Sequence, residues 1–410
     1  MADVLTPHSA KDIEASVQWA LAHGKTIEIL GHGSKRAIGR PLKTDLVLDM
    51  SGLSGVTLYE PQELVLSAKA GTSIAEIDAL LASEGQQLAF EPMDVGPLFG
   101  ASAGRGTLGG TVAANLSGPR RIKIGAARDH VLGFSAVSGM GEAFKSGGRV
   151  VKNVTGYDLS KLMAGSWGTL AALTDLTIKV LPRPETESTV LLFGCDESSA
   201  VHAMVAATRS SCDVSGAAHL PAAAAAAIGI DEVASASRAI TAFRIEGVAP
   251  SVAHRKAALQ SLSGSFGEIG VLDEALSSEL WRNIRDAIPF AAARTGAERP
   301  LWRVSTAPAR GAEAAALVGQ TSGAEVMFDW AGGLLWVLLP SCEDSGAALV
   351  RRAVAAVGGH ATLIRAPADA RAAIDVFEPQ DPPLAALTRR VKEGFDPNRT
   401  FNPRRMWAGQ

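Results

Sequence analysis

The sequence predicts an α+β fold over residues 1–184, an α/β domain over residues 185–375 and a C-terminal segment over residues 376–410. Three observations lead to this division. Helix and strand patterns alternate with short connections before residue 90, a glycine-rich stretch follows, and the pattern changes after Pro182-Arg-Pro184. Because 410 residues exceed one ordinary hydrophobic core, two or three domains are expected.

The N-terminal elements follow from caps and apolar spacing. Ser9 and Asp12 form a capping-box pattern before apolar residues spaced by four, which predicts a helix ending at Gly24. Ser73 and Glu76 cap a second predicted helix in the same way. Strands are expected at residues 26–30, 46–48, 64–70, 131–137, 149–151 and 173–180.

Residues 90–125 show no lasting helical or strand period, and a long irregular stretch inside a domain is usually functional. The domain after Pro184 is expected to be a sheet covered by alanine-rich helices. Its strands are expected at residues 188–193, 239–245 and 334–339, and its helices at residues 198–209 and 345–357.

Composition excludes several function classes. A formal net charge of -3 argues against nucleic acid as the main partner. The three cysteines form no C-x-x-C pair and are too few for an iron–sulfur cluster, which needs about four thiolates. No signal peptide or membrane-spanning stretch is recognisable, so a soluble, cytoplasmic protein is expected.

Two glycine-rich loops are candidates for binding phosphate. The first, Gly31-His-Gly33-Ser-Lys35-Arg-Ala-Ile-Gly39, directly follows a predicted strand, so its backbone N–H groups can form an anion nest. The second, Gly104-Arg-Gly106-Thr-Leu-Gly109, matches G-x-G-x-x-G, but no strand leads into it. A nicotinamide-binding Rossmann domain is therefore disfavoured, and a P-loop is excluded because no Gly-Lys-Ser/Thr ending exists. Alternatively, any one of these glycines, taken alone, could be present only because a turn requires it.

These motifs resemble a known superfamily. Residues 26–184 resemble the FAD-binding domain of the vanillyl-alcohol oxidase and para-cresol methylhydroxylase (PCMH) superfamily. The resemblance rests on the first loop and on Ala70-Gly-Thr72, Thr107-Leu-Gly-Gly110, Ala113-Ala-Asn-Leu-Ser-Gly118, Gly165-Ser-Trp-Gly-Thr-Leu170 and Phe395-Asp-Pro. Within it, the stretches from Val150 to Gly165 and from Pro300 to Ser305 are similar to the E-subunit family of bacterial glycolate oxidase (glycolate dehydrogenase).

The resemblance implies a PCMH-type FAD-binding domain of two α+β subdomains, an α/β cap domain and a C-terminal segment that returns to the FAD-binding domain. FAD would be bound noncovalently, because His32 lies between two glycines instead of following a glycine pair. No metal site is implied. The residues implied to contact FAD are Gly31, His32, Gly33, Ser34, Lys35, Gly39, Thr107, Leu108, Gly109, Gly110, Thr111, Ala114, Asn115, Gly118, Gly165, Gly168, Thr169, Leu170 and Asn402.

The implied activity is oxidation of glycolate or another small 2-hydroxy acid. Such chemistry needs an arginine that binds the carboxylate, and Arg303 is a weak candidate for it. It also needs a base. The base stays unassigned, because the His-x-x-Gly-Asp-Gly-Asn string of related dehydrogenases is absent. The implied partners are a second FAD subunit and an iron–sulfur subunit that passes electrons to quinone. Whether these partners attach the chain peripherally to the inner membrane is left open. A stand-alone FAD-linked oxidase and a non-catalytic FAD-binding assembly subunit remain alternatives.

Overall fold

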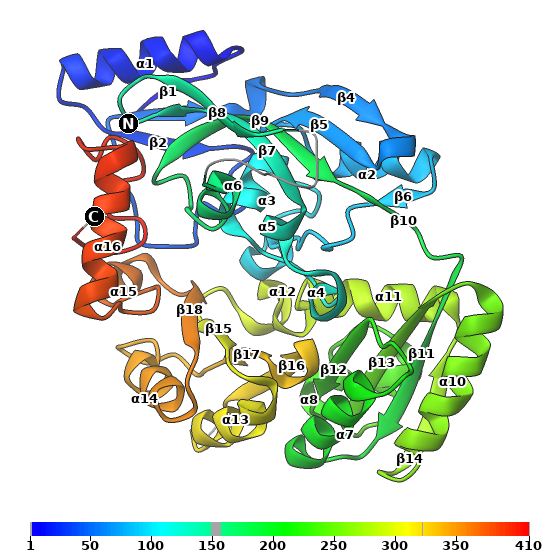
Figure 1. The fold of residues 1–410 in the computed structure, drawn as a ribbon. Coiled ribbons are helices and arrows are strands. Elements are labelled where there is room, and N and C mark those ends of the chain that lie inside the picture. The colour runs from blue at the N-terminus through cyan, green and yellow to red at the C-terminus, as the bar shows by residue number, and fades with distance from the viewer. Residues whose placement is uncertain (1, 149–156, 322, 410) are drawn as a thin grey trace.

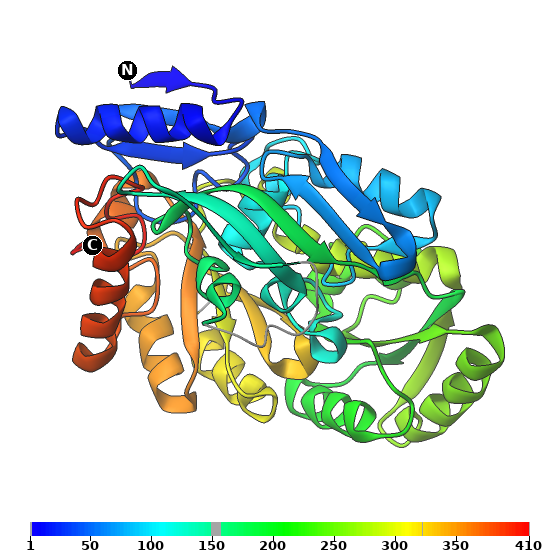
Figure 2. The same ribbon diagram turned by 45° about the horizontal axis from the view of Figure 1, so that its top comes forward.

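The computed structural model describes residues 2–148, 157–321 and 323–409. Figures 1 and 2 show an N-terminal region (residues 2–184) stacked on a middle region (residues 185–375), with the C-terminal segment (residues 376–409) along one side of both. Helices and strands mix throughout, which confirms the predicted mixed fold class. None of the helices in the described ranges is both long and apolar enough to cross a membrane.

The chain begins with a small parallel sheet in the order β1-β3-β2, made of β1 (Asp3–Leu5), β2 (Ile27–Leu30) and β3 (Leu46–Asp49). Helix α1 (Ala10–Ala22) packs on it. The predicted capping box is confirmed: Ser9 Oγ accepts from the Asp12 N–H, and the Asp12 carboxylate accepts from the Ser9 N–H. The apolar face of α1 is buried against these strands.

A five-stranded antiparallel sheet forms the second half of the N-terminal region. Its order is β4 (Val56–Glu60), β5 (Val65–Lys69), β9 (Ala171–Lys179), β7 (Val131–Ser138) and β8 (Ala143–Gly147). The sequence analysis missed β4 and β8, and the strand that it expected at residues 149–151 lies outside the described residues. The two-stranded ladder of β6 (Gln86–Gln87) and β10 (Leu181–Pro182) and helix α2 (Ile74–Ser83) complete this subdomain.

The sequence predicts an irregular stretch over residues 90–125, but the structure has helices there. It contains α3 (Leu108–Ala114) and α4 (Arg121–Ile124), and α5 (Ala127–His130) and α6 (Leu159–Met163) follow. Helix α3 was not predicted, because it is buried nearly all round. Its sequence therefore shows no separate apolar and polar faces. Its two glycines also have low helix propensity.

The middle region is built on an eight-stranded antiparallel sheet. Its strand order is β14 (Glu268–Leu272), β11 (Thr186–Phe193), β13 (Ile240–Gly247), β12 (Gly216–Leu220), β16 (Glu325–Asp329), β17 (Leu334–Leu338), β15 (Leu301–Ser305) and β18 (His360–Arg365). Its helices are α7 (Glu197–Arg209), α8 (Ala222–Ala226), α9 (Asp231–Ala234), α10 (Ala249–Ser263), α11 (Glu274–Arg285), α12 (Ala292–Thr295), α13 (Gly311–Gly319), α14 (Ala347–Val357) and α15 (Ala368–Ala373).

The sheet of the middle region has helices on both faces. Figure 1 shows α7, α13 and α14 on the face away from the N-terminal region, whereas α11, α12 and α4 lie between this sheet and the N-terminal region. The covered sheet confirms the predicted architecture. Apolar side chains of the N-terminal region, such as Leu98 and Trp167, belong to the same core cluster as the sheet, so the two regions share buried surface.

The C-terminal segment returns to the N-terminal region, as predicted. Helix α16 (Pro382–Phe395) ends at Asp396, whose fully buried carboxylate accepts from the N–H groups of Thr400 and Phe401. Lys392 Nζ lies 2.6 Å from the same carboxylate and donates to the carbonyls of Thr169 and Phe401. Phe401 then forms a parallel bridge with Ile27 of β2.

We expect Asp396→Asn to destabilise the protein, because it leaves the buried Lys392 ammonium without its counter-charge. Breaking a buried pair from one side costs about 3–5 kcal/mol of unfolding free energy. Urea denaturation followed by tryptophan fluorescence measures this loss. The matched control is Glu313→Gln, which removes the solvent-exposed pair with Arg310 and should change the unfolding free energy by less than about 0.5 kcal/mol. Equal effects of the two substitutions would contradict this assignment.

Candidate functional site

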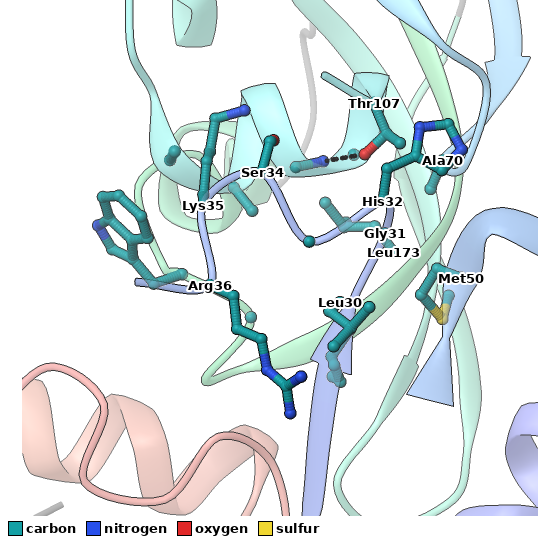
Figure 3. Close-up of a pocket in the computed structure, with 18 of the residues that line it drawn as sticks. Leu30, Gly31, His32, Ser34, Lys35, Arg36, Met50, Ala70, Thr107 and Leu173 are labelled. Atoms are coloured by element: carbon teal, nitrogen blue, oxygen red, sulfur yellow. Dashed lines mark hydrogen bonds between the residues drawn. The ribbon is translucent and has the colours of Figure 1, made fainter. Parts of the chain in front are cut away.

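A cleft runs through the N-terminal region between its two subdomains. It is lined by the loop after β2, the first turns of α3, the backbone around Gly168, and Arg405 of the C-terminal segment. About 710 Å³ of space within it, which is open to solvent, is free of protein atoms. Figure 3 shows residues of the loop together with Thr107, Ala70, Met50 and Leu173 among those that line this space.

The loop from Gly31 to Lys35 is shaped by its glycines. A Cβ at Gly31 would lie 2.7 Å from Thr107 Oγ1, so only glycine allows the loop to approach α3 this closely. Gly33 has φ +74°, a left-handed conformation that other residues rarely adopt. Figure 3 shows that Lys35 and Arg36 leave the loop in opposite directions, and Arg36 forms a bidentate pair with Glu28.

This loop offers unsatisfied donors to the cleft. The consecutive backbone N–H groups of His32, Gly33, Ser34 and Lys35 donate no hydrogen bond to any residue in the described ranges. Buried backbone donors are nearly always paired, so a run of free donors that faces a cleft is a place for an anion or for water. The loop therefore has donors free for the anion nest that its sequence predicts.

Lys35 adds a cation to the nest. It is 8% exposed, and its ammonium forms no ion pair or hydrogen bond within the described part of the chain. Burial lowers the pKa of Lys35 to about 8, although Asp94 acts in the opposite direction and Arg405 in the same one. A buried lysine without a partner gains stability when an anion binds beside it.

Helix α3 forms the opposite wall. Thr107 is its N-cap, and its Oγ1 accepts from the Gly110 N–H at 3.2 Å. Gly109 packs directly on Ala70, where a Cβ would lie 2.8 Å from the Ala70 Cβ. At Gly110 a Cβ would meet only Thr107 Oγ1, at 3.0 Å. The first turn of α3 therefore presents backbone instead of side chains to the cleft.

These features fit FAD. The nest and Lys35 suit its pyrophosphate, and the small residues of α3 leave room for an extended cofactor. Of the residues that the sequence implied, the structure brings these to the cleft: Gly31, His32, Gly33, Ser34, Lys35, Thr107, Gly109, Gly110, Ala114 and Gly168.

The other implied residues are not part of this lining: Gly39, Leu108, Thr111, Asn115, Gly118, Gly165, Thr169, Leu170 and Asn402. Several of them support its walls. Asn402 Oδ1 accepts from the Ile29 N–H, and Asn402 Nδ2 donates to the Trp167 carbonyl. This buried side chain thus connects the C-terminal segment with two stretches of the wall.

The lining also contains Arg36, Ala70, Ala113 and Trp167, which belong to the motifs that carry the resemblance, and Ile29, Leu30, Met50, Ala171, Leu173 and Arg405, which the sequence did not indicate. Arg405 is the most informative of these. Its Nη2 donates to the Lys35 carbonyl at 2.8 Å, and its guanidinium lies 5.6 Å from the Trp167 ring centroid.

Arg303, the weak candidate for the carboxylate, lies apart from this lining, on β15 of the middle region. Its guanidinium lies 4.8 Å from the Trp330 ring centroid. Two other late arginines have structural roles: Arg365 donates to the Leu98 and Phe290 carbonyls, and Arg294 pairs with Glu325.

Comparison with known proteins agrees with this geometry. Residues 2–147 match the family model described as FAD binding domain. The chain is 34% identical over 393 residues to glycolate oxidase subunit GlcE of Escherichia coli, with 96% of this chain and 95% of that protein covered. It is 31% identical to glycolate oxidase subunit GlcD of Bacillus subtilis over 189 residues, which cover 46% of this chain and 38% of that protein.

Solved structures show the same fold at low sequence identity. A p-cresol methylhydroxylase with bound substrate matches with a TM-score of 0.71 and 12% identity, covering 99% of this chain and 89% of that one. An alkyldihydroxyacetonephosphate synthase matches with a TM-score of 0.69 and 17% identity, covering 98% and 75%. The fold is therefore PCMH-type, the N-terminal region is an FAD-binding domain, and the chain belongs to the family of glycolate oxidase subunit GlcE.

Proposed function

We propose that this chain is the FAD-binding subunit of a glycolate oxidase (glycolate dehydrogenase) complex that oxidises glycolate or a related small 2-hydroxy acid to the 2-oxo acid. The observation that carries the proposal is the anion nest of residues 32–35 with the buried, unpartnered Lys35 beside it. The family of the chain supports the choice of substrate class.

In this proposal the loop N–H groups and Lys35 hold the pyrophosphate of FAD, while α3 and the backbone around Gly168 form the walls of the site. When bound, FAD supplies the acceptor for the hydride of the acid. We infer noncovalent attachment, because His32 lies between Gly31 and Gly33 on the nest itself, where the loop is occupied with the pyrophosphate.

We further propose that the complex contains a second flavin subunit and an iron–sulfur subunit that passes electrons to quinone, so that this chain reaches the membrane only through its partners. The cysteine content supports a separate iron–sulfur chain. The whole sequence has three cysteines, Cys195, Cys212 and Cys342, and two of them are buried in the middle region. An iron–sulfur cluster needs about four thiolates.

An anaerobic visible spectrum of the purified chain, before and after glycolate, tests the proposal. We expect flavin bands and release of FAD by acid. Bleaching by glycolate would place the chemistry on this chain, as in a stand-alone oxidase, whereas bound flavin that stays oxidised would place reduction on a partner. A chain that neither contains nor takes up FAD would contradict the proposal and leave an assembly subunit.

The affinity for FAD should fall as pH rises through 8. The pKa of Lys35 is about 8 without the cofactor, and the bound pyrophosphate favours the charged ammonium, so above that pH binding must include uptake of a proton. FAD should bind about tenfold more weakly at pH 9 than at pH 7. Flavin fluorescence titration of the FAD-depleted chain measures this ratio.

Lys35→Met should weaken FAD binding at pH 7 about 10- to 100-fold, the range for a lost hydrogen bond to a charged group, and should abolish the pH dependence. The control is Lys43→Met, which removes an exposed lysine just beyond the loop. Retention of the pH effect in the Lys35 variant would show that another group titrates.

Filling the cleft should separate FAD binding from folding. Gly110→Leu places a side chain in the open space beside Thr107, so we expect loss of bound FAD with little change in the melting temperature of the FAD-free chain. The control is Gly394→Leu on α16, where a Cβ meets no atom within 4 Å, and it should retain FAD. Thermal unfolding and the ratio of flavin to protein absorbance give the two readouts.

A further inference from the structure

Trp330 lies where the middle region meets the N-terminal region. It follows β16, and its backbone has φ 52°, which is unusual for a bulky residue. Its indole Nε1 donates to the Gly118 carbonyl at 3.1 Å, in the loop that follows α3. Such strained positions persist only when the surrounding contacts hold them, and they cluster at ligand sites.

Two arginines from different regions pack on this one indole. Cζ of Arg121, on α4, lies 4.1 Å from the centroid of the Trp330 ring, and Cζ of Arg303, on β15, lies 4.8 Å from it. Two like charges are thus brought together, and an anion that binds between them would reduce their repulsion.

Neither guanidinium has a partner within the described residues: no hydrogen bond or ion pair joins Arg121 or Arg303 to an acceptor there. Burial lowers the pKa of Arg303 to about 10, and Arg121 acts in the same direction. The neighbouring Asp329 does not supply a full counter-charge, because burial raises the pKa of its carboxyl to about 7 and it already accepts from the Trp330 N–H. Arg121 is exposed and Arg303 is partly buried, whereas a fully buried arginine such as Arg244 is paired.

On the face that carries Arg303 the sheet is polar toward β18, whereas the buried Trp336 and Leu334 of β17 lie on the other side of Arg303. Arg303 pairs with Thr362, and Ser305 pairs with His360, on the neighbouring strand β18. Side chains alternate along a strand, so these four lie on one face, while Trp302 and Val304 are buried on the other. None of the four side chains is hydrogen-bonded within the described ranges, and all are at least partly exposed. A small polar molecule can therefore reach them.

We propose that Arg121 and Arg303, brought together on Trp330 between the two regions, bind the carboxylate of a small organic acid. This inference rests on the proposed function, in which that acid is the 2-hydroxy acid oxidised by the complex. Planar guanidinium donors match the geometry of a carboxylate, and the polar face of β15 and β18 offers donors and acceptors for the remaining oxygens. The GlcE-type chain would then bind the acid itself instead of leaving recognition entirely to a partner.

Isothermal titration of the purified, FAD-containing chain with oxalate tests this site, because oxalate is a small carboxylate that cannot donate a hydride. We expect saturable binding to the wild-type chain. Arg303→Met and Arg121→Met should each weaken it about 10- to 100-fold, the range for losing a hydrogen bond to a charged group. Arg303→Lys should bind with intermediate affinity, because it keeps the charge but not the fork.

The matched control is Arg352→Met, which removes an exposed cation from α14 of the same region and should bind oxalate as the wild type does. The melting temperature of the unliganded Arg303→Met chain should be equal or higher, since a partly buried charge without a described partner is removed. Flavin absorbance of each variant shows whether FAD is retained. If the purified chain lacks FAD, the proposed function fails while the oxalate titration still decides on the site. Unchanged oxalate affinity in both arginine variants, no binding to the wild type, or equally tight binding of inorganic phosphate would overturn the assignment.

Discussion

The buried ion cluster around Glu91 fixes the middle region on the N-terminal region. The Glu91 carboxylate lies 2.8 Å from Arg244 Nη1 on β13 and 3.1 Å from Arg120 Nη1. Glu246 also pairs with Arg120, which makes two acids and two bases in all. Burial alone would raise the pKa of Glu91, but Arg244 and Arg120 hold it below its usual value. Because losing any one member strands a buried charge, the cluster tolerates only one relative placement of the two regions.

With the two regions fixed in this way, the charged side chains fall into two groups, those that the chain itself pairs and those that it does not. Where a buried charge holds the fold, the chain supplies its partner, as with Glu91 and Arg244 or Lys392 and Asp396. Where a buried or partly buried cation faces a cleft or an open sheet face, no partner is present among the described residues, as with Lys35 and Arg303. A desolvated charge without a partner destabilises a protein. Its retention at two places that solvent can reach indicates that an anion binds at each of them.

The sequence predicted local features well. The capping box of α1 and the glycines of the loop after β2 depend on residues within a few positions of one another, and both are found as expected. Features that depend on distant contacts were missed. Helix α3 is buried nearly all round and so has no amphipathic pattern. The role of Arg405 in the cleft depends on a hydrogen bond to Lys35, 370 residues earlier, which no local pattern reveals.

The two anion sites differ in how they could have been found. The nest of residues 32–35 consists of one short glycine-rich segment directly after a strand. Anion binding by this segment could therefore be predicted from the sequence. The pair on Trp330 combines α4 and β15, which are about 180 residues apart and meet where the Glu91 cluster and the Trp330–Gly118 hydrogen bond join the two regions. Arg303 alone looks like any arginine on a strand. Its significance comes from Arg121 and from the lack of a described acceptor for either, and those are properties of the folded chain.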